Sequence, residues 1–171
     1  LGSGERITRV RRTLNHFGGS LDPHAGFLLA RGTKTLALRV RAQNANALAL
    51  ARFLASHPKV KEVNYPGLEA HPDHAHARKL LSGFGGMLSL RLEGGVAAAE
   101  RLIRSVLIPY VAPSLGGVET LIVQPAKSSH AGMKREERER LGITEDLLRV
   151  SCGIEAAEDL VEDFRQGLEK V

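Results

Sequence analysis

One arginine stands inside an apolar, strand-prone stretch. Arg149 lies within residues 147–151, between leucine and valine side chains. An unpaired guanidinium is costly to bury, and its planar fork binds a carboxylate through two parallel hydrogen bonds. The pattern therefore predicts a carboxylate partner for Arg149. Either a ligand supplies that carboxylate or an acidic residue such as Glu119 or Glu155 does, and the residues alone leave both open.

A glycine-rich loop is the second candidate for binding chemistry. Ser114 and Leu115 precede Gly116 and Gly117, a run that lets backbone approach a ligand closely. Ser114 is accordingly a candidate ligand-binding residue. The alternative is an ordinary loop serine.

Three histidines, His71, His74 and His76, stand at a spacing that could suggest a metal site. On a helix, His71 and His74 share a face, but His76 departs from it. We therefore predict no metal here. Residues 83–86, Gly-Phe-Gly-Gly, do not follow a strand and open a helix as a phosphate cradle requires, so we expect them to begin a strand where backbone packs closely.

The composition excludes several classes of protein. With 171 residues and 43% hydrophobic content, the chain can bury a genuine core. An excess of 24 Lys+Arg over 19 Asp+Glu gives a modest net charge of +5, and aromatic residues make up only 4%. No nucleic-acid module and no stacking platform for single strands is evident. A solvated basic surface is the simpler interpretation.

The single cysteine and the ends of the chain bear on its location. Cys152 has no second cysteine to pair with, which fits a reducing, cytoplasmic setting. No apolar stretch approaches the roughly 20 residues that span a bilayer, and no signal-peptide pattern opens the chain. The sequence begins at Leu1 rather than Met, and we expect it to be a piece of a longer chain.

Periodicity and turn residues predict alternating helices and strands. The longest helix, residues 35–56, carries apolar residues on one face from Leu36 and Val40 to Leu50 and Leu54, and at roughly 30 Å it could join two domains. Asp22 is the expected N-cap of a short helix that begins at Pro23 and stops at Gly32. Other helices are predicted over residues 5–17, 71–81, 97–106, 134–141 and 156–168.

Strands are predicted over residues 60–65, 87–92, 120–123 and 147–151. This alternation favours an α/β (α+β-like) domain, with a sheet of about four short strands covered by helices.

Five segments, in order along the chain, carry a family likeness. They are residues 31–36 (RGTKTL), 65–68 (YPGL), 83–87 (GFGGM), 114–119 (SLGGVE) and 148–155 (LRVSCGIE). Together they resemble the Cys/Met-metabolism (trans-sulfuration) family of pyridoxal-phosphate enzymes, of the cystathionine γ-synthase and γ-lyase kind.

The resemblance implies the C-terminal portion of a fold-type I enzyme that uses pyridoxal phosphate. Residues 1–32 would be the tail of the large cofactor domain, and residues 33–171 the small domain with its linking helix 35–56. Such enzymes are typically homotetramers. The alternatives are a cystathionine β-lyase, a methionine γ-lyase, an O-acylhomoserine sulfhydrylase, or a free-standing non-catalytic module for oligomerisation or regulation.

The same resemblance assigns roles to residues of the candidate site. Arg149 would bind the α-carboxylate of an amino-acid substrate, a sulfur-containing or O-acylated homoserine derivative, while Ser114 and Leu115 line the pocket. Pro113 stands where many relatives have glutamate, at a position associated with reaction preference, and resembles plant-type cystathionine γ-synthases. Ser129 matches a family Thr-His-Ala-Gly-Met segment near the site.

The lysine that would hold the cofactor is not found. Pyridoxal-phosphate chemistry needs a lysine amine for a Schiff base. None of the seven lysines stands in the Ser-x-Thr-Lys context of the family, and Lys34 matches a different family segment. We therefore expect the chain to be inactive by itself.

Overall fold

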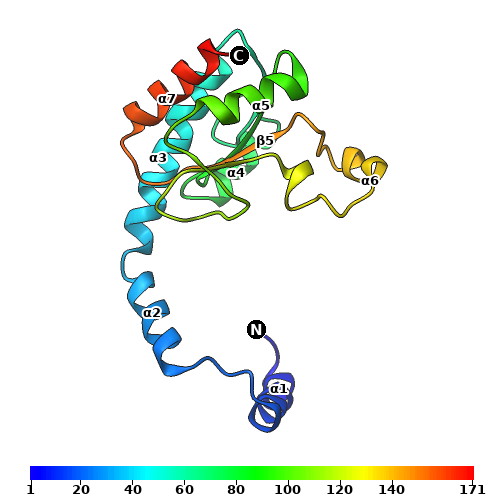
Figure 1. Ribbon diagram of the computed structural model, residues 1–171. Coiled ribbons are helices and arrows are strands. Elements are labelled where there is room, and N and C mark those ends of the chain that lie inside the picture. The colour runs from blue at the N-terminus through cyan, green and yellow to red at the C-terminus, as the bar shows by residue number, and fades with distance from the viewer. The chain divides into compact units, whose positions relative to one another are not determined.

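The computed structural model describes residues 1–171, which form two compact units, Leu1–Ala37 and Leu38–Val171. The first unit contains helices α1 (Gly4–Phe17) and α2 (Pro23–Thr33), drawn in blue in Figure 1. Neither helix buries a residue, so this unit has no hydrophobic core of its own. Its assignment to the tail of a large domain stays a prediction.

The predicted start of α2 is confirmed in atomic detail. The Asp22 carboxylate accepts hydrogen bonds from the backbone N–H groups of His24 and Ala25 at 3.0 and 3.1 Å, with Pro23 at the first helical position. These bonds satisfy two of the donors that a helix N-terminus otherwise leaves unpaired.

Helix α3 (Leu36–Ala55) matches the long predicted helix to within a residue at each end. Only the second half of its expected apolar face is buried, from Ala47 to Leu54, whereas Leu36 and Val40 remain exposed. The periodicity therefore located the helix correctly, but the sheet of the second unit covers less of it than the pattern alone suggests.

The second unit is built on a five-stranded sheet with the order β1-β2-β5-β4-β3. Neighbouring strands are antiparallel except for the parallel pair β3 and β4. The strands are β1 (Val60–Asn64), β2 (Met87–Leu92), β3 (Tyr110–Val111), β4 (Leu121–Val123) and β5 (Leu148–Ser151). The prediction of about four strands missed β3, because two exposed residues carry no periodic signal.

Helices cover one face of this sheet, which we call the helix face. Along β2, Leu88, Leu90 and Leu92 are buried and alternate with half-buried residues, as a two-residue period requires. They join Leu148 and Val150 of β5 in one core. Figure 1 shows α3, α5 (Gly95–Ser105) and α7 (Ala157–Glu169) grouped over this face, and buried residues of all three helices complete the core.

The opposite face, which we call the site face, carries the alternate residues of the same strands. Ser89, Arg149 and Ser151 belong to it because Leu88, Leu148 and Val150 occupy the helix face. Helix α6 (Arg135–Arg140) lies apart from the three core helices in Figure 1. The remaining elements are α4 (His74–Leu80) and the 3₁₀ turn η1 (Pro125–Lys127). No helix combines the length and the apolar character needed to cross a membrane.

Candidate functional site

Arg149 lies near the centre of the sheet, between β2 and β4. In register, it faces Ser89 on one side and Val123 on the other. Its Nη2 donates hydrogen bonds to the backbone carbonyl oxygens of Pro113 and Ser114, at 2.9 and 2.8 Å. These neutral acceptors fix the orientation of the guanidinium and leave its positive charge without a counterion.

No acidic residue of the chain neutralises Arg149. None of the ion pairs in residues 1–171 includes it, and its Nε is buried without a hydrogen-bond partner. Glu155, one of the two acidic partners considered from the sequence, accepts instead from the backbone N–H and the hydroxyl of Thr120, at 2.6 and 2.8 Å. The arrangement leaves Arg149 able to bind an external carboxylate.

The loop that receives Arg149 is residues 113–119, which we call the glycine loop. Ser151, on the same face of β5 as Arg149, accepts a hydrogen bond from the backbone N–H of Gly116 at 3.0 Å. The Gln43 amide of α3 donates to the carbonyl oxygen of Gly117 at 2.7 Å. Gly116 has a φ of 76°, which favours glycine. With its backbone held in this way, the loop exposes Ser114 and Leu115.

The C-terminal end of the glycine loop is fixed by a buried network. The Thr120 hydroxyl donates to Glu155 and accepts from the backbone N–H of Gly153 at 2.8 Å. Asn46 of α3 donates to the carbonyl oxygens of Gly153 and Glu155, at 3.1 and 2.8 Å. A side chain at Gly153 would meet the Val118 carbonyl oxygen, so the sequence that follows β5 needs glycine there.

Pro113 and Ser129 occupy different surroundings. Pro113 lies in the wall of a hollow of about 290 Å³, together with Gln124 and Ser128. Ser129 is exposed, and its hydroxyl is hydrogen-bonded to the neighbouring His130 ring at 2.9 Å. The structure thus brings Arg149, Pro113, Ser114 and Leu115 together, while the part that Ser129 plays stays a prediction.

The sequence did not single out the residues that anchor the loop. Ser151 could have been found, because it follows Arg149 by two residues and therefore shares its face of the strand. Gln43, Asn46 and Thr120 gave no such signal. Their bonds join segments that are 33 to 109 residues apart, and only the folded chain brings these together.

Residues 83–86 precede β2, which begins at Met87, so they lead into the strand rather than begin it as predicted. The hydroxyl of buried Tyr65 donates to the Gly85 carbonyl oxygen at 2.9 Å, and a side chain at Gly86 would press on the Cys152 carbonyl and on Gln43. Burial raises the pKa of the Cys152 thiol to about 12 and that of Tyr65 to about 12. Both groups are therefore neutral near pH 7, and the thiol is a packing group rather than a nucleophile.

Two of the three histidines, His71 and His74, form hydrogen bonds that hold the local loop structure. His71 accepts at Nδ1 from the backbone N–H of Asp73 at 3.1 Å, and its Nε2 lies 2.7 Å from the Asn64 side-chain oxygen. His74 bonds the Pro66 carbonyl oxygen at 2.8 Å and stacks on Phe84. No three His, Cys, Asp or Glu side chains in residues 1–171 are grouped so as to hold a metal.

No lysine of the chain has the surroundings of a Schiff-base residue. Such an amine is activated by desolvation or by a cationic neighbour. Six of the seven lysines are exposed, and the seventh, half-buried Lys59, donates to the Leu168, Glu169 and Val171 carbonyls at 2.8, 3.3 and 3.1 Å. The residues present therefore do not fit a covalently held aldehyde cofactor.

Comparison with known proteins identifies the family of the chain. Residues 2–169 match the family described as Cys/Met metabolism PLP-dependent enzymes. The chain is 42% identical over 170 residues to cystathionine γ-synthase 1, chloroplastic, of Arabidopsis thaliana, covering 99% of this chain and 30% of that protein. It is 45% identical over 168 residues to cystathionine γ-lyase of Bacillus subtilis, covering 98% of this chain and 43% of that protein.

A solved structure agrees with the fold. Cystathionine γ-synthase from Xanthomonas oryzae pv. oryzae, in complex with aminoacrylate and cysteine, superposes with a TM-score of 0.92 at 43% identity, covering 98% of this chain and 43% of that one. This confirms the predicted fold class, and the chain spans less than half the length of these relatives. By sequence and fold, the chain belongs to the Cys/Met metabolism family of pyridoxal-phosphate-dependent enzymes.

Proposed function

We propose that this chain is the C-terminal part of a trans-sulfuration enzyme of the cystathionine γ-synthase or γ-lyase type. The enzyme would act on sulfur-containing or O-acylated homoserine amino acids. One observation carries the proposal: the Arg149 guanidinium is held in place by two backbone carbonyls while its charge has no counterion. Amino-acid substrates carry the carboxylate that this site lacks.

In this proposal the chain provides the carboxylate side of the active site. Arg149 binds the substrate α-carboxylate through its guanidinium fork, and the bonds to Pro113 and Ser114 set the direction of that fork. Ser114 and Leu115, on the exposed part of the glycine loop, line the space beside it. Pro113, at the edge of the neighbouring hollow, is placed to influence which group of the substrate is accommodated.

The cofactor side belongs to the rest of the enzyme. Pyridoxal phosphate is the cofactor of the family, yet no lysine of this chain is suited to hold it. We propose that the chain is inactive by itself and that the full enzyme is a cytoplasmic homo-oligomer. Adding pyridoxal phosphate to the isolated chain should give no visible absorbance band of lysine-bound cofactor, and such a band would contradict this assignment.

Two measurements test the proposed function. An intact-mass measurement of the source protein should give about twice the 18.5 kDa of this chain or more. A native product of 18.5 kDa would instead support a free-standing module. The full-length protein is then offered cystathionine, and separately an O-acylhomoserine with cysteine. Ketoacid release or cystathionine formation is expected, and the absence of both would overturn the proposal.

A further inference from the structure

One ion pair stabilises the long connection between β4 and β5. We call residues 124–147 the arm: it carries η1, the candidate residue Ser129 and helix α6. Helix α6 has the sequence REERER and buries a single side chain, that of Arg138. The helix therefore has no apolar face with which to pack. Its buried position is occupied by Arg138, whereas leucines occupy such positions in α3, α5 and α7.

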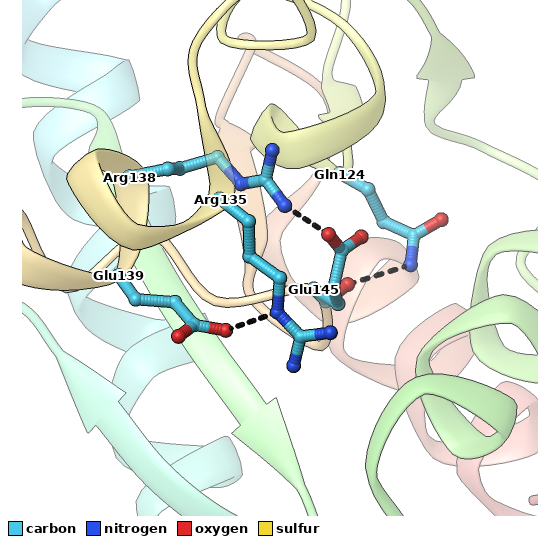
Figure 2. A network of polar contacts seen from close by, with 5 residues as sticks. All are labelled: Gln124, Arg135, Arg138, Glu139 and Glu145. Atoms are coloured by element: carbon cyan, nitrogen blue, oxygen red, sulfur yellow. Dashed lines mark hydrogen bonds and ion pairs between the residues drawn. The ribbon is translucent and has the colours of Figure 1, made fainter.

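Arg138 is paired within the arm. Its Nη2 forms an ion pair and hydrogen bond with Glu145, as Figure 2 shows. The Arg138 side chain is 7% exposed, so removal of Glu145 would leave a nearly buried cation without a partner. One turn away, Arg135 pairs with Glu139 at 2.7 Å, but that arginine is 70% exposed and its pair is of the weak surface kind.

The buried pair is connected to the strands that carry the candidate site. The carbonyl oxygen of Glu145 accepts a hydrogen bond from the Gln124 side chain at 3.2 Å, which joins the two ends of the arm (Figure 2). Gln124 directly follows Val123, the β4 residue in register with Arg149. The ends of the arm are thus joined beside the strand pair that presents Arg149.

Gln124 is also close to the loop residue whose carbonyl oxygen accepts a hydrogen bond from Arg149. Gln124, at the root of the arm, and Pro113, at the start of the glycine loop, lie in the wall of the same hollow of about 290 Å³. The Pro113 carbonyl oxygen is one of the two that orient Arg149. A shift of Gln124 would therefore change the support of the loop on which the guanidinium rests.

We propose that Arg138 and Glu145 are positioning residues for substrate binding. Their ion pair, acting through Gln124, holds β4, β5 and the start of the glycine loop in the geometry that lets Arg149 bind a carboxylate. This inference rests on the proposed function, because it takes Arg149 as the residue that binds the substrate. Neither Arg138 nor Glu145 contacts the substrate in this account.

The test uses the full-length enzyme and separates KM from kcat. Arg138→Ala should raise KM for the amino-acid substrate at least about tenfold and change kcat less than about twofold, because substrate binding is weakened while the reacting groups are untouched. The swapped pair R138E/E145R should return KM to within about threefold of the parent enzyme. Arg135→Ala, on the same helix, is the matched control and should leave both constants unchanged.

A purely structural role predicts a different pattern. In that case Arg138→Ala lowers the fraction of folded enzyme, so that kcat falls, KM stays constant and the swapped pair restores only the yield. That pattern would overturn the proposal. Gln124→Leu leaves the Arg138–Glu145 ion pair in place and removes the hydrogen bond from the Gln124 side chain to the Glu145 carbonyl oxygen. It should raise KM about threefold even if Arg138→Ala does not fold, and an unchanged KM in that variant also counts against the proposal.

Arg149→Ala in the same assay distinguishes a failure of the positioning role from a failure of the proposed function. If Arg149→Ala raises KM and neither Arg138→Ala nor Gln124→Leu does, the positioning role is wrong and the proposed function stands. If Arg149→Ala leaves KM unchanged, the proposed function itself fails at this site.

Discussion

The two faces of the sheet are built from different interactions. On the helix face, leucine and valine side chains of β2 and β5 pack against three helices in one continuous core. On the site face, Gln43 and Arg149 donate hydrogen bonds to carbonyl oxygens of the glycine loop, and the Ser151 hydroxyl accepts one from the loop backbone. The first face depends on buried area, which is non-directional, and the second on donors and acceptors at fixed distances.

This difference predicts how each face responds to substitution. A truncated leucine on the helix face should reduce the stability of the whole unit and leave the geometry of the site largely intact. A changed residue on the site face should cost little stability and should displace the loop that orients Arg149. Neighbouring residues of one strand can therefore be used to separate folding from binding.

The largest expected effect is on the helix face. Leu90 is 1% exposed. Leu90→Ala should lower the free energy of unfolding by about 2–5 kcal/mol, because the cavity that the truncated side chain leaves cannot close completely. The next residue, Arg91, points to the other face and pairs with exposed Glu62, so Arg91→Ala should cost no more than about 1 kcal/mol. Urea denaturation of residues 1–171 measures both, and similar losses would contradict the division between the faces.

Alkaline pH should weaken the helix face through two buried groups. Cys152 and Tyr65 have pKa values raised to about 12 from ordinary values of 9.0 and 10.0. The unfolded chain releases these protons first. Stability is therefore complete below pH 9 and falls towards pH 12, by up to about 1.4 kcal/mol per pH unit for each group.

Denaturation at pH 8 and pH 11 measures this loss. Cys152→Ala and Tyr65→Phe should each reduce the difference between the two values. A difference that neither substitution alters would show that other groups are responsible.

A smaller effect is expected where β5 leaves the sheet. Gly153→Ala places a methyl group against the Val118 carbonyl oxygen and the Glu155 carboxylate, which should cost about 1–3 kcal/mol and move the glycine loop. Gly132, in the arm, has no atom within 4 Å of the position of an added Cβ. Gly132→Ala should therefore change stability by less than about 0.5 kcal/mol. Equal effects in denaturation experiments would remove the case for a close approach at Gly153.

Much of the helix face could be predicted from the sequence. Helices α3, α5 and α7 and strands β2 and β5 follow the periodicity of their apolar residues, with ends that differ by one or two residues. Helix α4 begins at His74 rather than at residue 71, because His71 forms a turn with Asp73. Strand β3 was missed since its residues are few and exposed.

The site face was less predictable for a physical reason. An arginine in an apolar strand indicates that a partner is needed, but the pattern does not say where the partner lies. The Ser114 carbonyl that orients Arg149 is 35 residues away in sequence, and the antiparallel pairing of β4 with β5 brings the two together. The resemblance to known relatives, rather than periodicity, linked these two segments in advance.

The most direct test of the account asks what Arg149 recognises. Full-length enzyme, Arg149→Leu and Arg149→Lys are each supplied with the amino-acid substrate and with its α-carboxamide, and kcat/KM is measured. The parent enzyme should prefer the carboxylate, and the leucine variant should lose about a hundredfold of that preference, since two charge-assisted hydrogen bonds disappear. Lysine should restore part of it through charge alone. A preference that is the same in all three proteins would contradict the assignment of Arg149 as the carboxylate-binding residue.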